Sequence, residues 1–201
     1  MPETAYLPDL PLGWQWASVE QVTERIVDCL HSTPNFVSEG ELCIDTNCIK
    51  PGKIVFEKVR YVDLHTFADR NRRMEPQVND VLFSREGALL GVAVRIPDKL
   101  KICLGQRMMI FRLCEVVLAR YYEMVLNSPL FRSQYAKEIT GSASPHLNIQ
   151  AIRKYRIPLP PLAEQKRIVV ELERRLSIVE KAGATVATDL IRAEKLRQAI
   201  L

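Results

Sequence analysis

The segment 162–201 constrains the fold most strongly, because it contains no proline and its apolar residues recur at alternating spacings of three and four. The predicted helix-pairing positions are Val169, Leu172, Leu176, Val179, Val186, Leu190 and Ile200, and Gly183, Ala193 and Arg197 fill the same stripe. A helix of about 40 residues is about 60 Å long, which exceeds the width of the domain before it. The stripe therefore predicts a coiled-coil pairing with a second helix, either from a missing part of the same polypeptide or from a second copy. The alternative is a helix that lies back across its own domain.

A proline cluster separates this helix from the rest of the chain. Pro158, Pro160 and Pro161 hold the sequence IPLPP extended, because proline fixes its own φ and disfavours helix in the residue before it. A helix can begin at Pro161 or just after it, with Glu164 in the first turn, where the helix dipole favours negative charge. Two parts are predicted, a domain over 1–160 and a long helix over 161–201.

Residues 1–160 combine strand-like and helix-like segments, which predicts an α+β domain with a mixed sheet. Strands are predicted over 41–49, 53–63, 80–85, 91–96, 100–104, 107–113 and 156–159. Helices are predicted around 65–72 and over 115–128, 128–140 and 149–155. Ser128 is a good N-cap with Pro129 at the first helical position, and Ser18 and Gln21 have capping-box spacing at the start of a short helix or turn.

Charge is unevenly distributed in a chain whose net charge is +4. Residues 1–50 carry −6, residues 51–160 carry +8 and residues 161–201 carry +2. A basic middle section suits a polyanionic partner such as nucleic acid, although many ordinary domains share this bias.

Several classes of protein find no support in the sequence. There is no run of 18 apolar residues and no signal peptide at the N-terminus, so a cytoplasmic protein without membrane contact is expected. The five cysteines form no C-x-x-C and complete no zinc pattern, which predicts mostly buried small side chains. No phosphate-binding loop, dinucleotide fingerprint, hydrolase elbow or metalloprotease motif occurs, and no amino-methyltransferase motif. Catalysis by this chain alone is not expected.

Five segments together resemble the specificity (S) subunit of type I restriction–modification enzymes. They are LPLGW, DCLHSTP, NDVLFSREGALLG, IRKYRIPLPPLAEQKRIVVELERRL and LRQAIL. The proline-rich segment is the most specific of them. In NDVLFSREGALLG, Asn79 stands where the family has glycine, and the A-F-x-G continuation usual after LRQAIL is missing.

The resemblance implies a division of labour between the two parts. Residues 1–160 would be a target recognition domain that reads one half of a split DNA sequence. The helix over 161–201 would act as a spacer and would dock modification (M) subunits, through which restriction (R) subunits join. The chain itself would bind no cofactor, and S-adenosylmethionine would belong to the M subunit. Since complete S subunits carry two such units, the chain would be a half-size subunit that pairs with itself or another half, or a truncated longer one.

DNA contacts are then expected from three loops and from the phosphate-contact candidates Lys50 and Lys53. The loop residues are His31, Ser32, Thr33 and Asn35, then Arg70, Asn71, Arg72 and Arg73, and finally Ser142, Ser144, His146 and Asn148. Arginine to guanine and asparagine or glutamine to adenine are the usual base contacts. The alternative roles are a hydroxyl-stabilised turn, a solvated charge cluster and a helix-capping loop. Arg85 could face either DNA or an internal carboxylate.

Two other functions stay open. The chain could be a dimeric adaptor whose basic surface binds something other than DNA. It could also be a regulatory half-subunit that pairs with a full specificity subunit and alters its choice of site.

Overall fold

A computed structural model describes residues 7–97, 99–139 and 145–200, with the backbone alone for 137–138 and 199–200. Contacts divide the chain into two units, Met1–Leu162 and Ala163–Leu201. The first unit is α+β and the second is one long helix, so the predicted fold class is confirmed. The roles assigned to the two parts stay predictions.

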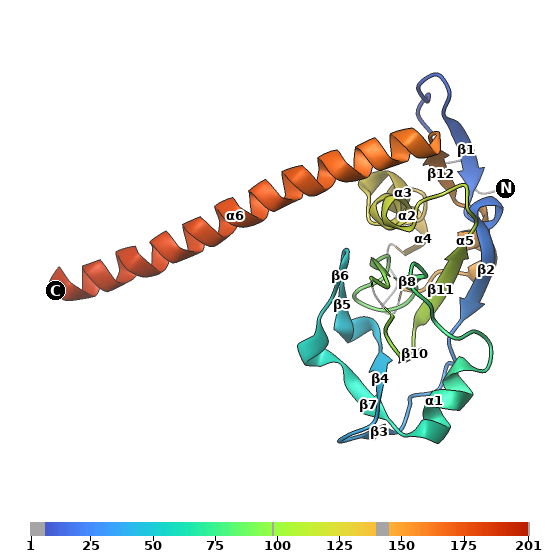
Figure 1. The fold of residues 1–201 in the computed structure, drawn as a ribbon, viewed down its shortest axis with the longest axis horizontal. Coiled ribbons are helices and arrows are strands. Elements are labelled where there is room, and N and C mark those ends of the chain that lie inside the picture. Colours follow the sequence, from blue (N-terminus) through green and yellow to red (C-terminus); the bar gives the residue numbers. More distant parts are fainter. Residues whose placement is uncertain (1–6, 98, 140–144, 201) are drawn as a thin grey trace. The chain divides into compact units, whose positions relative to one another are not determined.

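One sheet of the first unit is antiparallel throughout, with the strand order β2–β11–β8–β9 (Figure 1). Its strands are β2 (Thr23–Asp28), β8 (Val81–Ser84), β9 (Ala93–Arg95) and β11 (Met108–Leu113). β8 and β9, from the predicted strands 80–85 and 91–96, form a hairpin in which Leu82 is paired with Val94. All four residues of β8 are buried, which suits a strand covered on both faces.

A second sheet is mixed, as predicted, with the order β10–β4–β7–β3. Its strands are β3 (Phe36–Val37), β4 (Glu41–Ile44), β7 (Arg60–Val62) and β10 (Ile102–Leu104). β10 is parallel to β4, and the other pairs are antiparallel. Gly105 follows β10 so closely against Asp45 that a Cβ there would lie 2.5 Å from the Asp45 Cβ, so glycine is required for this approach.

Two short ladders complete the strands. β1 (Gln15–Ser18) pairs with β12 (Arg156–Leu159), and β5 (Ile49–Lys50) pairs with β6 (Lys53–Ile54). Three 3₁₀ turns are η1 (Glu20–Val22), η2 (Thr46–Cys48) and η3 (Phe56–Lys58). The β1–β12 ladder joins the beginning and the end of the globular sequence.

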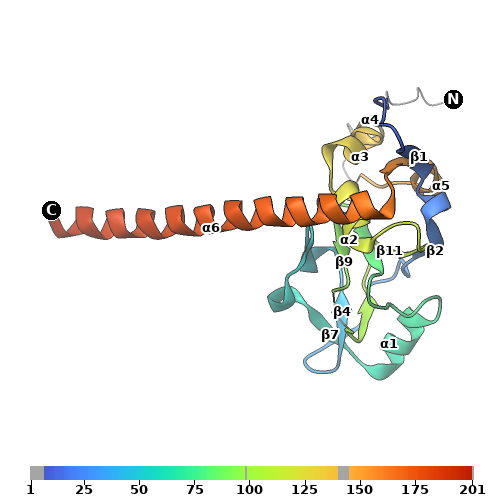
Figure 2. The same ribbon diagram turned by 45° about the horizontal axis from the view of Figure 1, so that its top comes forward.

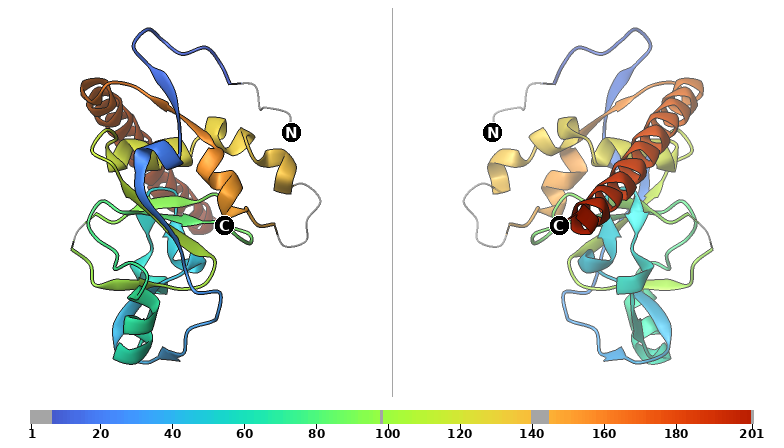
Figure 3. Two further views of the ribbon diagram at one scale, coloured as in Figure 1. Left: turned by 90° about the vertical axis from the view of Figure 1, so that its right-hand side faces the viewer. Right: turned by 90° about the vertical axis from the view of Figure 1, so that its left-hand side faces the viewer.

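The helices of the first unit lie at its two ends (Figures 1 and 3). They are α1 (Leu64–Asn71), α2 (Ala119–Leu126), α3 (Pro129–Ser133), α4 (Ala136–Ile139) and α5 (Ile149–Lys154). α2–α5 lie at the end of the β1–β12 ladder, whereas α1 lies at the end of the mixed sheet. The predicted cap of α3 is confirmed, because Ser128 Oγ accepts the Phe131 N–H at 3.2 Å.

An aromatic cluster joins the helices α2 and α3 to the antiparallel sheet. Phe83 of β8 packs edge-on against Phe111 of β11 and Phe131 of α3, with ring centroids 5.9 Å and 6.4 Å away. Phe111 also meets Tyr122 of α2 at 5.7 Å. Such pairs stabilise a core beyond their buried area. Complete burial raises the pKa of Tyr122 well above its usual range.

The short helix or turn predicted from Ser18 is confirmed as η1, but the strands on either side of it were not predicted. The capping-box bonds are present, since Ser18 and Gln21 each accept the other's backbone N–H, at 3.2 Å and 2.7 Å. However, they close only the turn η1, and the chain continues as β2. β1 and β2 are both absent from the predicted strands. Their ladders with β12 and β11 use partners far away in sequence, and such tertiary pairing overrides local propensity.

Asn79 adopts a backbone conformation that suits glycine, the residue that specificity subunits are expected to have at this position. Its φ is 70°, in the left-handed region that glycine occupies freely and asparagine tolerates better than most residues. Its Oδ1 accepts a hydrogen bond from Arg95 Nη1 at 3.1 Å. The substitution therefore keeps the turn before β8.

The five cysteines are free thiols, and four of them are buried, as predicted. Burial raises the pKa of Cys29 and of Cys48 to about 11, so both stay neutral near pH 7. In the described part of the chain, no group of three His, Cys, Asp or Glu side chains could hold a metal ion.

The second unit is α6 (Leu162–Ile200), an uninterrupted helix in Figure 2. Its bounds agree with the proline-free segment of the sequence. Among the described helices, none combines the length and apolar character needed to cross a membrane.

Candidate nucleic-acid interface

Segments from four places in the sequence meet at one cluster of loops in the first unit. They are the 28–32 segment after β2, the 85–87 turn after β8, the 105–107 turn between β10 and β11, and the 145–148 segment before α5. Each is tied to another of the four by hydrogen bonds. We call this group the loop cluster. It contains parts of two predicted DNA-contact loops.

Arg85 lies at the centre of the loop cluster. Its Nε and Nη2 donate to the two carboxylate oxygens of Asp28 at 2.8 Å and 3.1 Å, and Nη1 donates to the Leu147 carbonyl at 3.2 Å. Both side chains of the Arg85–Asp28 pair are only 8% exposed. Bidentate pairing of this kind satisfies two buried charges at once. Arg85 was expected to face either DNA or an internal carboxylate. The structure shows it bound to an internal carboxylate, that of Asp28.

Asp28 also holds His31 at the surface. His31 Nε2 lies 2.9 Å from Asp28 Oδ2, and the His31 side chain is 64% exposed. Ser32, Thr33 and Asn35 follow it, all exposed. The first predicted loop thus presents polar groups outward on a base anchored by Asp28 and Arg85.

The second predicted loop, 70–73, begins with two residues that form hydrogen bonds within the protein, and one of them binds the backbone of the first predicted loop. Arg70 is buried, and its guanidinium donates to the carbonyls of Leu30, Ser32 and Leu104. Asn71 Nδ2 donates to the Ile102 carbonyl at 3.0 Å. Both residues therefore donate within the protein. Arg70 fixes the path of the 30–32 backbone, whereas Asn71 binds β10.

The two remaining residues of that loop are exposed. Arg73 Nη1 donates to the Asp28 carbonyl at 3.2 Å, and Arg72 is paired with Asp69 at 3.3 Å. Both interactions lie at the surface, so both guanidinium groups keep donors accessible to solvent. Contact of any of the four residues with DNA stays a prediction.

The third predicted loop joins the cluster at 145–148. The Leu147 N–H donates to the Arg85 carbonyl at 2.9 Å, and the Gly87 N–H donates to the Pro145 carbonyl at 3.0 Å. His146 is exposed beside Glu86, with which it forms an isolated β-bridge. Asn148 caps α5 by accepting the Gln150 N–H at 2.8 Å, which matches the helix-capping alternative. Ser142 and Ser144 lie outside the described residues.

Lys50 and Lys53 lie apart from these loops, on the β5–β6 hairpin. They are exposed and directly opposite each other in the ladder. Neither side chain has an ion-pair partner within the described part of the chain. Like charges in directly opposed positions repel, and an anion bound between them would relieve this repulsion.

Two members of the cluster, Gln106 and Arg107, are absent from the predicted contacts. Gln106 Nε2 donates to the His31 carbonyl at 2.8 Å, and the Arg107 carbonyl accepts the Arg85 N–H at 3.1 Å. No local sequence signal identifies them, because they form part of this surface only through contacts with distant residues.

α6 presents a second surface, formed by the predicted pairing positions. Val169 is partly exposed, and Leu172, Leu176, Val179, Val186 and Leu190 are exposed, whereas the side chain of Ile200 lies outside the described part. Leu190 is 61% exposed and Val186 is 67% exposed. Apolar side chains left in water to this extent are typical of a surface that binds a partner.

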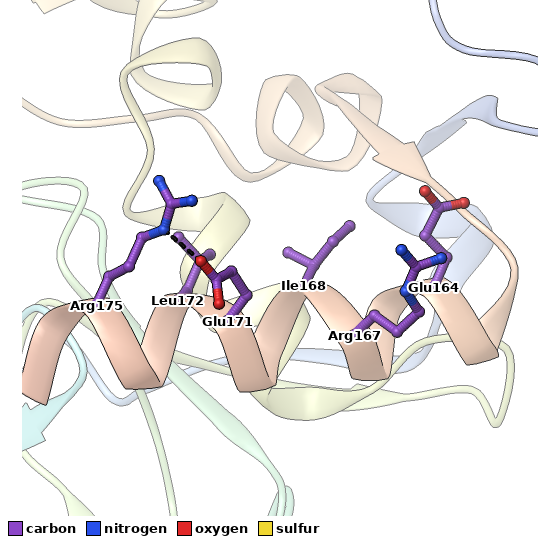
Figure 4. A pocket seen from close by; sticks show the side chains of 6 residues that line it. All are labelled: Glu164, Arg167, Ile168, Glu171, Leu172 and Arg175. Carbon is purple, nitrogen blue, oxygen red and sulfur yellow. Dashed lines mark hydrogen bonds and ion pairs between the residues drawn. The ribbon is translucent and has the colours of Figure 1, made fainter.

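Charged side chains accompany the stripe on α6 (Figure 4). Glu171 accepts hydrogen bonds from Arg174 and Arg175, and these hold the pKa of Glu171 at about 2. Figure 4 shows Ile168 and Leu172 among these charged groups. Further exposed apolar residues lie outside the predicted heptad positions: Val170, Ile178, Ile191 and Leu196.

Fold and surfaces together define the class of protein: an α+β domain with a loop cluster, followed by a long helix with exposed heptad positions. The family model of the type I restriction modification DNA specificity domain matches residues 48–181. The chain belongs to this family, and the resemblance seen in the sequence is confirmed.

Two similar curated proteins are named specificity subunits of type I restriction enzymes. The chain is 21% identical over 178 residues to the type I restriction enzyme MjaVIII specificity subunit of Methanocaldococcus jannaschii, covering 86% of this chain and 41% of the relative. It is 25% identical over 188 residues to the EcoKI specificity subunit of Escherichia coli, covering 90% and 40%. The chain therefore spans about two fifths of the length of these relatives.

Solved structures show the same fold. A chain from the structural study of assembly and conformational transition in the type I R-M system has a TM-score of 0.64 at 21% identity, covering 93% of this chain and 45% of that one. The HsdS subunit of Thermoanaerobacter tengcongensis has a TM-score of 0.58 at 21% identity, with 86% and 40% covered.

Proposed function

We propose that this chain recognises DNA for a type I restriction–modification complex, reading one half of a bipartite target with its first unit. The observation that carries this proposal is the loop cluster, in which buried pairs fix the backbone while polar side chains face solvent. His31, Ser32 and His146 are exposed in this cluster, and Thr33 and Asn35 are exposed next to it in the sequence. A surface that is rigid underneath and polar outside suits base reading, because the donors are already in position.

Phosphate contacts would supply most of the affinity and carry no sequence information. Lys50 and Lys53 suit this role, since they are exposed and without an ion-pair partner among the described residues. Arg72 and Arg73 suit it in part, because both also bind within the protein. Arg70 and Arg85 would act indirectly, by positioning the loops.

The exposed stripe of α6 would pair with a second helix and dock modification subunits. Each fully buried leucine or valine contributes about 1.5–3 kcal/mol. Several such side chains are exposed on α6, so association has a substantial driving force. Restriction subunits would join through the modification subunits.

Chemistry would belong to the partners. The chain would bind no cofactor itself, and S-adenosylmethionine would be bound by the modification subunit. A recognition subunit without catalysis agrees with the absence of a catalytic motif from the sequence.

The test is selection from a randomised duplex DNA library by the full chain together with its modification subunits and S-adenosylmethionine. Enrichment of one sequence motif is the expected result. A complex that assembles but enriches no motif would overturn the proposal. A sample without the chain is the control for binding by the modification subunits alone.

A second candidate function is regulatory pairing with another specificity subunit, and the exposed stripe of α6 favours it. In that case the chain alone with modification subunits would enrich no motif. Adding a full specificity subunit would then yield a motif different from that subunit's own.

A further inference from the structure

Arg107 occupies an unusual backbone position within the loop cluster. It lies in the turn between β10 and β11, where its φ is 65°. Side chains other than glycine, asparagine and aspartate rarely adopt this region, because the Cβ approaches the backbone. An arginine kept in a position that suits glycine is evidence for a role of its side chain.

The backbone of this turn is held on both sides. The Arg107 carbonyl accepts the Arg85 N–H at 3.1 Å, and Arg85 is itself fixed by Asp28. Next to it, Gln106 Nε2 donates to the His31 carbonyl at 2.8 Å. The turn therefore has a defined position relative to the exposed His31.

The guanidinium of Arg107 has no partner among the residues that the structure describes. The residue is exposed, and its side chain has no hydrogen bond or ion pair with any residue that the structure describes. The guanidinium lies near Gly87, since a Cβ on Gly87 would be 3.4 Å from Arg107 Nη1, an ordinary contact distance. By contrast, the guanidinium groups of Arg70 and Arg85 are buried and engaged within the protein.

We infer that Arg107 is a specificity-determining residue that reads a guanine in the major groove. This inference rests on the proposed DNA recognition and adds to it a residue and a base. A planar guanidinium with free donors matches the two acceptors of guanine, O6 and N7, which makes arginine–guanine the commonest specific contact.

The surroundings favour a base contact over a phosphate contact. Phosphates are bound by several cations along the DNA backbone. Arg107 is instead accompanied by the polar groups of His31, Ser32 and His146, which are exposed in the same cluster. Arg107 is the exposed arginine of the loop cluster, and the Glu86 carboxylate in the same cluster is paired with Arg85. A guanidinium among exposed donors and acceptors suits a base-reading surface.

The test compares Arg107→Gly and Arg107→Lys with the unchanged chain. Each full-length chain, assembled with modification subunits and S-adenosylmethionine, selects from a randomised duplex DNA library. Its affinity for the enriched duplex and for an unrelated duplex is then measured at several salt concentrations. Glycine suits the positive φ, so removing the side chain this way leaves the turn unstrained. Arg156→Ala is the matched control, because Arg156 is an exposed arginine on β12, which pairs with β1 and lies outside the loop cluster.

The expected result is the loss of the guanine preference at one position of the motif in Arg107→Gly. Arg107→Lys should show a weaker preference there, because lysine can also donate to guanine O6 and N7. The affinity of the Arg107→Gly chain for the enriched duplex should fall about 10-fold or more, with little change for the unrelated duplex. Arg156→Ala should keep the motif. If the unchanged chain enriches a motif and Arg107→Gly enriches the same motif with every preference intact, this inference is wrong while the proposed function stands. A uniform loss on both duplexes with a smaller salt dependence would show a phosphate contact and would also overturn it. If the unchanged chain enriches no motif, the proposed function itself fails.

Discussion

The two units of the chain treat their charged and apolar side chains in opposite ways. In the first unit, Arg85 and Asp28 are buried as a pair, and Phe83, Phe111 and Phe131 form a closed cluster. In α6, every side chain described beyond Glu171 is exposed, apolar ones included. The first unit therefore buries an apolar core and pairs the buried Arg85 with Asp28, whereas the apolar stripe of α6 is exposed. Because of this difference, we expect that the first unit and α6 can be disrupted separately.

The largest expected effect comes from breaking the buried pair of the first unit. Arg85→Met removes the buried partner of the Asp28 carboxylate, which keeps the exposed His31 beside it, and should lower the free energy of unfolding by about 3–5 kcal/mol. Urea denaturation followed by tryptophan fluorescence measures it. Arg72→Ala, at a surface ion pair, is the control and should cost less than about 1 kcal/mol. Equal effects of the two variants would show that the Arg85–Asp28 pair is not a buried anchor.

A matching change in α6 should leave the first unit intact. Leu176→Asp combined with Leu190→Asp places charges in the stripe and should weaken self-association at least about 100-fold, since each leucine contributes about 1.5–3 kcal/mol when buried. Light scattering at micromolar concentration measures it, and the unfolding of the first unit should stay unchanged. Ser177→Asp is the control outside the stripe. A chain that is monomeric before mutation would count against self-pairing.

Adding one methyl group should destabilise the first unit. A Cβ at Gly91 would lie 2.1 Å from the Tyr135 hydroxyl oxygen, and the φ of Gly91 is 87°. Gly91→Ala should therefore lower the free energy of unfolding by about 2 kcal/mol. Thermal unfolding followed by circular dichroism measures it, and a neutral result would mean that Tyr135 is not held in place.

The same methyl group should stabilise α6. A Cβ at Gly183 would meet nothing within 4 Å, so Gly183→Ala should gain about 0.5–1 kcal/mol from helix propensity. The helical signal of the chain at low concentration, followed in urea, measures this gain. Weaker association in the Ala variant at high concentration would show that Gly183 permits close approach of a partner helix.

The smallest expected effect is the pH dependence of α6. The bonds from Arg174 and Arg175 lower the pKa of Glu171 from 4.5 to about 2. Because this pKa is depressed in the folded chain, the contribution is complete above pH 4.5 and is lost as the pH falls towards 2. Carbon NMR of the Glu171 carboxyl group should show a midpoint well below 4.5. A midpoint at 4.5 would show that these exposed pairs are not populated in solution. In the Glu171→Gln variant, the helix content of α6 should no longer fall between pH 4.5 and pH 2 because of this group.

The local elements could be predicted because their causes are local. Proline ended the globular part before α6, the heptad spacing marked the exposed stripe, and Ser128 with Pro129 marked the start of α3. The β8–β9 hairpin likewise lies within one short window of sequence. β1 and β2 could not be predicted in this way, because their partners β12 and β11 are far along the chain.

The candidate site also has a part that could be predicted from local sequence and a part that depends on contacts between distant residues. The sequence by itself determined which residue types were available for DNA contact, the polar and basic loops, and that a long helix would expose an apolar stripe. Only the tertiary structure decided which of these side chains are buried and which are exposed. It turned Arg70 and Arg85 inward and placed Arg107 outward beside the His31 loop. The physical reason is that periodicity and capping act within a few residues, whereas a buried charge is paired with whichever partner the folded chain brings next to it, here Asp28 for Arg85.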